Sequence, residues 1–339
     1  MSKKNSNVNL KNGFENFEDL SKIFLNFKDK LDNLNKKSYV VAVSGGPDSL
    51  ALVALTKAYN FLKKTKFYYV LINHNIRKNS NKEAQKVKKL LNEKKIPLKV
   101  FLNKKKITHN IQANARNARY NLLSTFCKKN NVKTILTAHN LEDQVETFFI
   151  RLSRGSGLTG LSSMKTLSRL DKKIYLYRPL LEIKKKYLIK ISKNVFKKYF
   201  KDPSNSNKKY LRSKIRSLKL PLKKSGIEYD QIIKSIKNLD SSRITIEEYL
   251  KKIFSEIIKK SGNEVLVDFK KFKKINPDVK ISIINEAIKK IKKNYYNPRS
   301  KKVINLIKNI ENKNFTKSTL AGCIFSKKKD LISLKIEKT

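Results

Sequence analysis

The chain has 339 residues, of which 79 are Lys or Arg and 27 are Asp or Glu, so its formal net charge is +52. This length predicts two domains, each large enough to bury a core. The charge predicts a polyanionic partner such as a nucleic acid, although the abundance of Lys, Asn and Ile also indicates a compositional bias. Only 11 of the basic residues are Arg. Each Arg is the more informative cation, because its planar fork binds phosphate or carboxylate in a way that Lys cannot copy.

The sequence lacks the marks of a secreted or membrane protein. Its two cysteines, Cys127 and Cys323, form no CxxC motif, so neither a disulfide framework nor a zinc cluster is expected. Residues 1–9 are polar and do not resemble a signal peptide, and no apolar run approaches the roughly 18 residues of a membrane helix. We therefore expect a cytoplasmic protein without membrane contact.

Strand-like and helix-like segments alternate along the first 200 residues, which predicts a doubly wound, mostly parallel sheet covered on both faces. Ligands of such α/β folds bind at the carboxyl ends of the strands. The expected strands are Tyr39–Val43, Phe67–Ile72, Leu98–Leu102, Lys133–Ala138 and Ile174–Tyr177. The expected helices are Leu50–Lys63, Lys82–Lys94, Ile111–Lys129, Glu142–Leu152 and Lys184–Phe200.

The character of the sequence changes near Pro221. From Glu228 to about Glu311 apolar residues recur at helical spacing, and from Phe315 to Ile336 they alternate as in strands. The expected divisions are an N-terminal extension (1–37), an α/β catalytic domain (38–220) and a smaller, mainly helical, basic domain with a strand-like end (221–339), which we expect to supply much of the nucleic-acid binding.

The most informative segment is the run Ser44-Gly45-Gly46-Pro47-Asp48-Ser49, which lies between the first expected strand and the first expected helix. Glycines let the backbone approach a phosphate closely, and the free N–H groups at a helix start point toward it. Ser44 and Ser49 add hydroxyl groups, and Asp48 is suited to hold a Mg²⁺ ion that neutralises diphosphate. An ordinary turn with an Asp N-cap is the alternative interpretation.

Further polar residues follow the other strands. His74 follows the second strand, where it can reach a nucleotide, and Arg116 and Arg119 lie three apart on one helix, where they can clamp an anion. A structural histidine and a solvated helix face are the alternatives.

An acidic pair and a basic pair complete the set of candidate residues. Asp143 and Glu146 share a face of the helix after the fourth strand, with no cationic partner evident in the sequence, and can bind Mg²⁺ or an ammonium group. Arg212 and Arg216 lie one turn apart and can bind phosphate, RNA or a substrate carboxylate. Helix-dipole acidity and a basic linker are the alternatives.

The loop at residues 44–49 resembles the pyrophosphate loop of the N-type ATP pyrophosphatases, which split ATP between its α- and β-phosphates. It is not a Walker loop, because no Gly-Lys-Ser/Thr follows. With the later motifs, residues 38–220 resemble the tRNA(Ile)-lysidine synthetases. Those later motifs are Arg116–Tyr120, His139–Thr147, Arg154–Gly160 with Met164, Asp202–Asn205 and the basic run 210–216.

The sequence departs from this family in a few places. Glu142 stands where members usually carry Asp, and Ser213 and Lys214 replace the expected Asn and Arg. The extra C-terminal domain of the longest members is also not recognised.

The resemblance implies an adenine nucleotide alpha hydrolase-like fold and one specific reaction. ATP adenylates the C2 oxygen of the wobble cytidine in an isoleucine tRNA with a CAU anticodon, and the ε-amine of free L-lysine then attacks C2 and releases AMP. The implied cofactors are ATP and Mg²⁺. The implied roles are nucleotide binding for residues 44–49 and His74, metal binding for Asp48 and Asp143, charge neutralisation at the α-phosphate for Arg119, lysine or metal binding for Asp143 and Glu146, and binding of the lysine carboxylate or the adenylated base for Arg212 or Arg216.

Two other functions stay open. One is a tRNA thiolase of the same superfamily, which the unpaired cysteines disfavour. The other is a non-catalytic RNA-binding protein, which the intact loop and the acidic pair disfavour. The sequence does not identify the general base for lysine attack. It also leaves the oligomeric state open, with a homodimer as one alternative.

Overall fold

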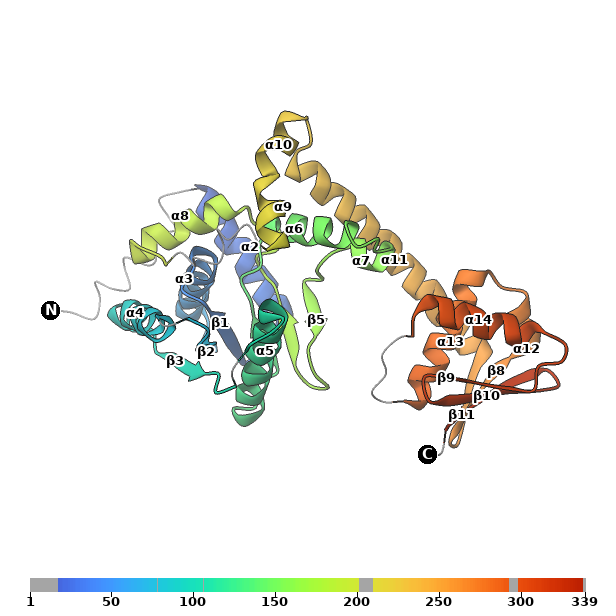
Figure 1. The fold of residues 1–339 in the computed structure, drawn as a ribbon. Coiled ribbons are helices and arrows are strands. Elements are labelled where there is room, and N and C mark those ends of the chain that lie inside the picture. Colours follow the sequence, from blue (N-terminus) through green and yellow to red (C-terminus); the bar gives the residue numbers. More distant parts are fainter. Residues whose placement is uncertain (1–17, 78, 106, 201–209, 293–297, 338–339) are drawn as a thin grey trace. The chain divides into compact units, whose positions relative to one another are not determined.

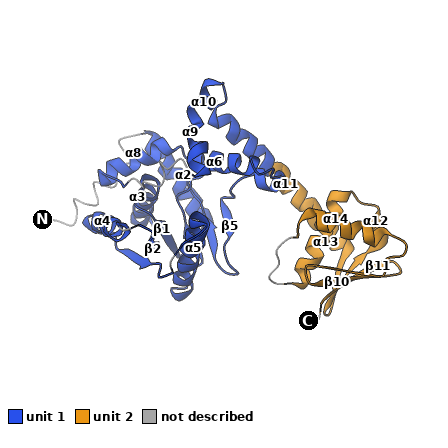
Figure 2. Cartoon of the chain, viewed as in Figure 1, with its two compact units in different colours: residues 1–240 blue, residues 241–339 orange. Residues whose placement is uncertain are grey.

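The chain folds into two compact units, Met1–Asp240 and Ser241–Thr339, each with its own hydrophobic core (Figure 2). The boundary expected near residue 220 divides the chain by function, between a catalytic domain and a basic domain, and it stays a prediction. The computed structural model describes residues 18–77, 79–105, 107–200, 210–292 and 298–337 (Figure 1).

The first unit is built on a mostly parallel sheet of six strands in the order β3-β2-β1-β4-β6-β5. Only β5 runs antiparallel to its neighbour. The fold class expected from the alternation of segments is confirmed, and β5 is the one strand of this sheet that was not expected. The strands are β1 (Ser38–Val43), β2 (Lys66–Asn73), β3 (Leu98–Leu102), β4 (Thr134–Leu136), β5 (Leu167–Arg169) and β6 (Tyr175–Tyr177).

Both faces of the sheet are covered because β1 buries alternate residues on opposite sides. Tyr39, Val41 and Val43 pack in one core with residues of α2, α3, α4 and α8. Val40 packs in a second core with residues of α5 (Figure 1). The helices of the first unit are α2 (Glu18–Leu34), α3 (Pro47–Leu62), α4 (Ser80–Glu93), α5 (Ile111–Lys129), α6 (Leu141–Leu152), α7 (Leu158–Leu161), α8 (Lys185–Phe196), α9 (Leu211–Ser217) and α10 (Lys219–Lys224).

The helix α2 lies in the segment expected only as an extension. It buries Leu20, Phe27 and Leu31 in the core of the sheet. This spacing places the three side chains on one helical face. The residues therefore carried a signal for a packed helix that the sequence analysis missed.

The helix α11 (Tyr229–Ile257) begins in the first unit, where Tyr229, Ile232 and Ile236 pack against Leu141 and Val145 of α6. This apolar contact joins the start of α11 to the helix that carries the predicted acidic pair. The basic helix α9, which precedes α11 in the chain, also packs against α6.

The second unit contains a five-stranded antiparallel sheet in the order β7-β8-β11-β10-β9. The expected strand-like end is confirmed by its last three strands. Its elements are β7 (Ile258–Ser261), β8 (Glu264–Asp268), α12 (Phe269–Lys273), α13 (Pro277–Ile291), α14 (Ser300–Glu311), β9 (Lys317–Leu320), β10 (Cys323–Lys328) and β11 (Leu331–Ile336).

The expectation of a helical pattern throughout residues 228–311 is wrong at the hairpin β7–β8. The turn is Gly262-Asn263, in which Gly262 has a φ of +54°, and Ser261 pairs with Glu264 across it. A Gly-Asn pair before alternating buried valines, here Val265 and Val267, is a hairpin signal. The longer-range helical spacing concealed it.

Gly45 is the position where the fold most needs a glycine. Its φ is +81°, and an added Cβ atom would lie 2.4 Å from Cγ2 of Val87 on α4. Gly155 has a similar φ of +65° but no atom within 4 Å of an added Cβ atom. The two glycines therefore separate the cost of the backbone conformation from the cost of the close approach.

We expect Gly45→Ala to lower the free energy of unfolding by about 2–4 kcal/mol, combining a left-handed backbone with overpacking. Gly155→Ala should cost only about 1–2 kcal/mol, because it has the backbone term alone. Urea unfolding checks both values. A double-mutant cycle of Gly45→Ala with Val87→Ala should assign the extra loss at Gly45 to the contact with Val87. Equal losses in Gly45→Ala and Gly155→Ala would contradict the role of that contact.

Candidate active site

The loop at residues 44–49 joins the end of β1 to the start of α3, as expected. Gly46 is the N-cap of α3, and no side chain caps this helix end. The Ser49 hydroxyl accepts from the Ser44 N–H and the Ser44 hydroxyl, each at 3.1 Å, and donates to the Gly46 carbonyl at 3.0 Å. The Ser49 hydroxyl thus links the two ends of the loop by hydrogen bonds. The first N–H groups of α3 face the carboxyl edge of the sheet.

Asp48 lies in the first turn of α3 with its side chain 23% exposed. Burial raises the pKa of this carboxyl group to about 6, the charge of Lys185 opposes the rise, and the charge of Asp143 adds to it. Its Oδ1 atom is buried and has no hydrogen-bond partner among the described residues. The Nζ atom of Lys185 lies 3.6 Å from its other oxygen. One carboxylate oxygen of Asp48 is therefore buried without a partner in the part of the chain that the structure describes.

Asp143 and Asn140 form a capping box at the start of α6. The Asn140 side chain accepts from the Asp143 N–H at 3.0 Å, and the Asp143 carboxylate accepts from the Asn140 N–H at 3.1 Å. The Asp143 Oδ1 atom also lies 3.4 Å from Nη2 of Arg212. Asp143 thus has a structural role, and its Oδ1 atom faces the basic helix α9.

Glu146 lies one turn further along α6 and is the most buried acid of the site, with 3% of its side chain exposed. It accepts from Nε of Arg212 at 2.8 Å, and from Nε and Nη2 of Arg216 at 2.7 and 3.0 Å. No cationic partner of the acidic pair was evident in the sequence, and the structure provides two, Arg212 and Arg216. The partners lie 66 and 70 residues away in sequence, so no local pattern could reveal them.

His74, at the end of β2, lies next to Arg119 of α5. Its Nε2 atom is 3.4 Å from Nη2 of Arg119, and its buried Nδ1 atom has no partner among the described residues. Burial, assisted by the charge of Arg119, lowers the pKa of His74 to about 4. Arg116 does not share this contact, because its guanidinium group lies over the Tyr120 ring at 4.9 Å.

His139 follows β4, and its Nδ1 atom lies 2.9 Å from the Thr137 hydroxyl. Burial and, to a smaller extent, the nearby charges of Arg178, Arg116, Arg212 and Arg119 together lower its pKa to about 3. His139 is therefore neutral, and it is surrounded by guanidinium groups from several elements. This concentration of positive charge at one edge of the sheet favours an anionic ligand.

The structure thus brings the predicted residues together in two neighbouring groups. One contains Asp48, Asp143, Glu146, Arg212 and Arg216. The other contains His74 and Arg119. The charges of Arg119 and Arg212, one from each group, both lower the pKa of His139. The motif at residues 202–205 lies outside the described residues.

The sequence analysis missed Lys185, the first residue of α8. Its side chain contacts Asp48, and its backbone N–H donates to Oε2 of Glu142 at 2.8 Å. Lys185 lies in a run of three lysines in a chain that contains 68 of them, 79 basic residues less 11 arginines. No signal in a single sequence distinguishes it from its neighbours.

The described residues contain no group of three or more His, Cys, Asp or Glu side chains arranged to hold a metal ion. A Mg²⁺ ion that accompanies a nucleotide needs fewer protein ligands, because one or two carboxylates and the phosphate oxygens suffice. Asp48, with its unpartnered Oδ1 atom, and Asp143 fit that requirement.

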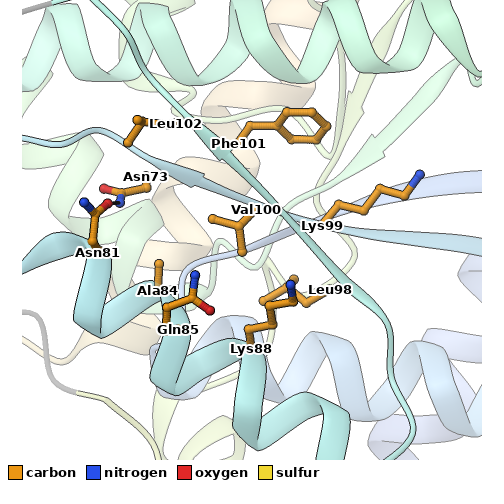
Figure 3. Close-up of a pocket in the computed structure, with 10 residues that line it drawn as sticks. All are labelled: Asn73, Asn81, Ala84, Gln85, Lys88, Leu98, Lys99, Val100, Phe101 and Leu102. Atoms are coloured by element: carbon orange, nitrogen blue, oxygen red, sulfur yellow. Dashed lines mark hydrogen bonds between the residues drawn. The ribbon is translucent and has the colours of Figure 1, made fainter.

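A hollow of about 530 Å³ lies elsewhere, between α4 and the edge strand β3 (Figure 3). Asn73, Asn81, Gln85 and Lys88 line it together with the side chains of β3. None of the predicted site residues lines this hollow, so it does not mark the candidate site.

None of the helices in the described part of the chain has the length and apolar character needed to cross a bilayer.

Residues 19–222 match a family model described as a PP-loop domain. A tRNA(Ile)-lysidine synthase from Orientia tsutsugamushi is 33% identical over 298 residues, which cover 84% of this chain and 66% of that protein. One from Rickettsia felis is 31% identical, with 89% of this chain and 70% of that protein covered. The chain belongs to the PP-loop family of tRNA(Ile)-lysidine synthases. It spans about two thirds of the length of these relatives.

This membership confirms the family predicted from the loop and the later motifs. Among solved structures, the U34-tRNA thiolase NcsA from Methanococcus maripaludis, with its [4Fe-4S] cluster, has a TM-score of 0.55 and 19% identity. The match covers 65% of this chain and 79% of the thiolase. At this identity the likeness supports the shared fold of the PP-loop family and nothing finer.

The neutral state of His139 gives a prediction for stability against pH. The unfolded chain takes up this proton near pH 6.5, whereas the folded chain resists it until about pH 3. Stability is therefore highest above the unfolded pKa and falls as the pH decreases, by about 2 kcal/mol between pH 7 and pH 5 for this one group.

Urea unfolding at pH 7 and pH 5 measures this loss. His139→Gln should reduce the difference between the two pH values by about 2 kcal/mol, because the titrating group is removed. His109→Gln, at an exposed histidine, is the matched control. An unchanged pH difference in His139→Gln would show that other groups cause the acid instability.

Proposed function

We propose that this chain ligates L-lysine to C2 of the wobble cytidine of an isoleucine tRNA with a CAU anticodon, at the expense of ATP. One observation carries the proposal: the PP-loop residue Asp48, the acid Asp143 and the arginines of α9 lie at one edge of the sheet. This arrangement puts a diphosphate-binding loop beside groups suited to an amino acid, and the relatives bear the corresponding name.

The first step is adenylation of the tRNA base. The C2 oxygen of cytidine attacks the α-phosphorus of ATP, the bond to the bridging oxygen breaks, and diphosphate leaves. The N–H groups of the loop and the start of α3 stabilise the charge on the phosphates. We assign the contact with the α-phosphate to Arg119, which lies beside the neutral His74.

The second step is attack by lysine. Its ε-ammonium group first loses a proton, and the amine then forms the C2–N bond while the C2–O bond breaks and AMP leaves. We assign the ammonium contact to Asp143, because both oxygens of Glu146 accept short hydrogen bonds from arginines, whereas Oδ1 of Asp143 makes a longer contact, 3.4 Å, with Arg212. Arg212 or Arg216 then binds the lysine carboxylate, and Glu146 fixes their orientation.

A Mg²⁺ ion is part of this proposal. Asp48 would hold it together with Asp143 during adenylation, before Asp143 contacts the lysine ammonium group in the second step, and the ion would neutralise the charge of the departing diphosphate. The two carboxylates lie close enough that the charge of Asp143 raises the pKa of Asp48. That proximity is the observation that supports a shared cation.

The large positive charge is assigned to tRNA binding in the cytoplasm. Phosphate contacts spread along a tRNA would position the wobble base, and such contacts depend steeply on salt. Lysines abound in both units, so each is a candidate surface for the RNA backbone.

A thiolase activity is the weaker alternative. Cys127 lies in the first unit and Cys323 in the second, and both are buried. A sulfur-transfer site needs accessible, paired thiols, so neither cysteine suits that chemistry. Sulfur in the tRNA product would nevertheless decide for it.

The direct test incubates a CAU-anticodon isoleucine tRNA transcript with the full chain, ATP and lysine, followed by mass spectrometry of the nucleosides. The product should gain one lysine less one water at a single cytidine. Asp48→Asn should lower the rate at least about a hundredfold, as expected for a lost charge-stabilising group, while tRNA affinity is kept. Asp29→Asn, at an exposed side chain of α2, should have no effect. Near-normal turnover in Asp48→Asn would contradict the metal role.

Glu146→Gln tests the proposed lysine site. We expect the KM for lysine to rise about tenfold or more and the KM for ATP to change little, because the orientation of two carboxylate-binding arginines is lost. Glu182→Gln, at an exposed acid that pairs with two lysines, is the control. If the KM for ATP rises instead, the acidic pair belongs to the metal site.

A further inference from the structure

The backbone and the side chain of Lys185 both make contacts beside the PP-loop. Its backbone N–H donates to Glu142 of α6 at 2.8 Å, and its Nζ atom lies 3.6 Å from Oδ2 of Asp48. The side chain is 34% exposed, so it reaches the carboxyl edge of the sheet without being enclosed. At 3.6 Å the ammonium group neutralises Asp48 but does not make a hydrogen bond to it.

Two helix N-termini meet at this contact. Asp48 is the second residue of α3 and Lys185 is the first residue of α8, and neither helix has a side-chain hydrogen bond from its N-cap residue. The helices pack together through one core, and the Phe200 N–H donates to the Gly45 carbonyl at 3.0 Å. The positive ends of both dipoles therefore point into the same region, which favours a multiply charged anion.

An independent observation indicates that a ligand belongs there. The Oδ1 atom of Asp48 is buried and has no partner within the described part of the chain. A buried carboxylate oxygen without a partner is costly unless a cation or a donor completes it when a ligand binds. Lys185 would then be released from Asp48 toward the ligand.

We propose that Lys185 is a diphosphate-binding residue, whose ammonium group passes from Asp48 to the β- and γ-phosphates when ATP binds. The assignment rests on the proposed ligase function, because it names the cation that stabilises the leaving group of the adenylation step. A lysine suits this role, since its compact charge and flexible stem can follow the diphosphate as it departs.

The neighbouring lysines provide matched controls. Lys184 pairs with Asp230 at 2.6 Å, on α11. Lys186 is exposed and lies over the Tyr187 ring at 4.8 Å. Both carry the same charge within one residue of Lys185, yet neither contacts the loop in the structure. A general effect of charge would therefore appear in all three positions.

The experiment is calorimetric titration of the full chain with magnesium diphosphate and, separately, with AMP. Lys185→Gln should weaken diphosphate binding about tenfold or more, the effect of one lost charge-assisted hydrogen bond, and leave AMP binding unchanged. Lys185→Arg should restore most of the affinity, and Lys186→Gln should behave as the wild type. Lys185→Met is a second neutral variant if Lys185→Gln does not fold, and retained AMP binding reports an intact site.

The outcomes separate this proposal from the ligase proposal, because neither titration needs tRNA or lysine. Equal diphosphate affinity in the wild type and Lys185→Gln would overturn the assignment of Lys185 alone. Equal losses in Lys185→Gln and Lys186→Gln would also overturn it, since they would indicate a general charge effect. Failure of the wild type to bind either ligand would instead contradict the proposed ATP-dependent reaction.

Discussion

The ion pairs of the buried Glu146 carboxylate with Arg212 and Arg216 are the interaction on which the site depends. A carboxylate with 3% of its side chain exposed would be strongly destabilising without partners, and each guanidinium group provides charge-assisted hydrogen bonds. Because Glu146 is on α6 and both arginines are on α9, the same contacts attach a basic helix to the edge of the parallel sheet. The core formed by α6 and the start of α11 supports that attachment.

The surrounding charges follow from this one constraint. With both oxygens of Glu146 occupied, Arg212 contributes positive charge next to Asp143 and His139. Burial is the main cause of the low pKa of His139, and the charge of Arg212 adds to it together with those of Arg178, Arg116 and Arg119. At the other side of the same edge, Asp48 keeps an unpartnered oxygen near Lys185. The site thus holds anion-binding and cation-binding groups close together, as a reaction between ATP and an ammonium-bearing amino acid would require.

The sequence predicted those parts of the site that depend on local patterns. The loop at residues 44–49 was recognisable because a short run of residues determines a strand, a turn and a helix start. The partners of Glu146 were not, because folding alone brings residues 66 and 70 positions apart into contact. Similarly, the strand β5 has only three residues and the hairpin β7–β8 interrupts a helical spacing, so tertiary pairing overrode the local signal. The contact of Lys185 with Asp48 could not be predicted because lysine is abundant in this chain, and an abundant residue type carries little information at any single position.

Glu142 departs from the family pattern, but its contacts in the structure indicate that the chemistry of the site is unchanged. The resemblance places an Asp where Glu142 stands, beside the acid Asp143. In the structure Oε2 of Glu142 accepts from the Lys185 N–H at 2.8 Å, and its other oxygen lies 3.3 Å from Nζ of Lys219. Both contacts join α6 to neighbouring helices, and the charge of Glu142 is the same as that of an Asp. The extra methylene therefore changes the reach of a structural acid, while Asp48 and Asp143 keep the carboxylates that face the proposed nucleotide.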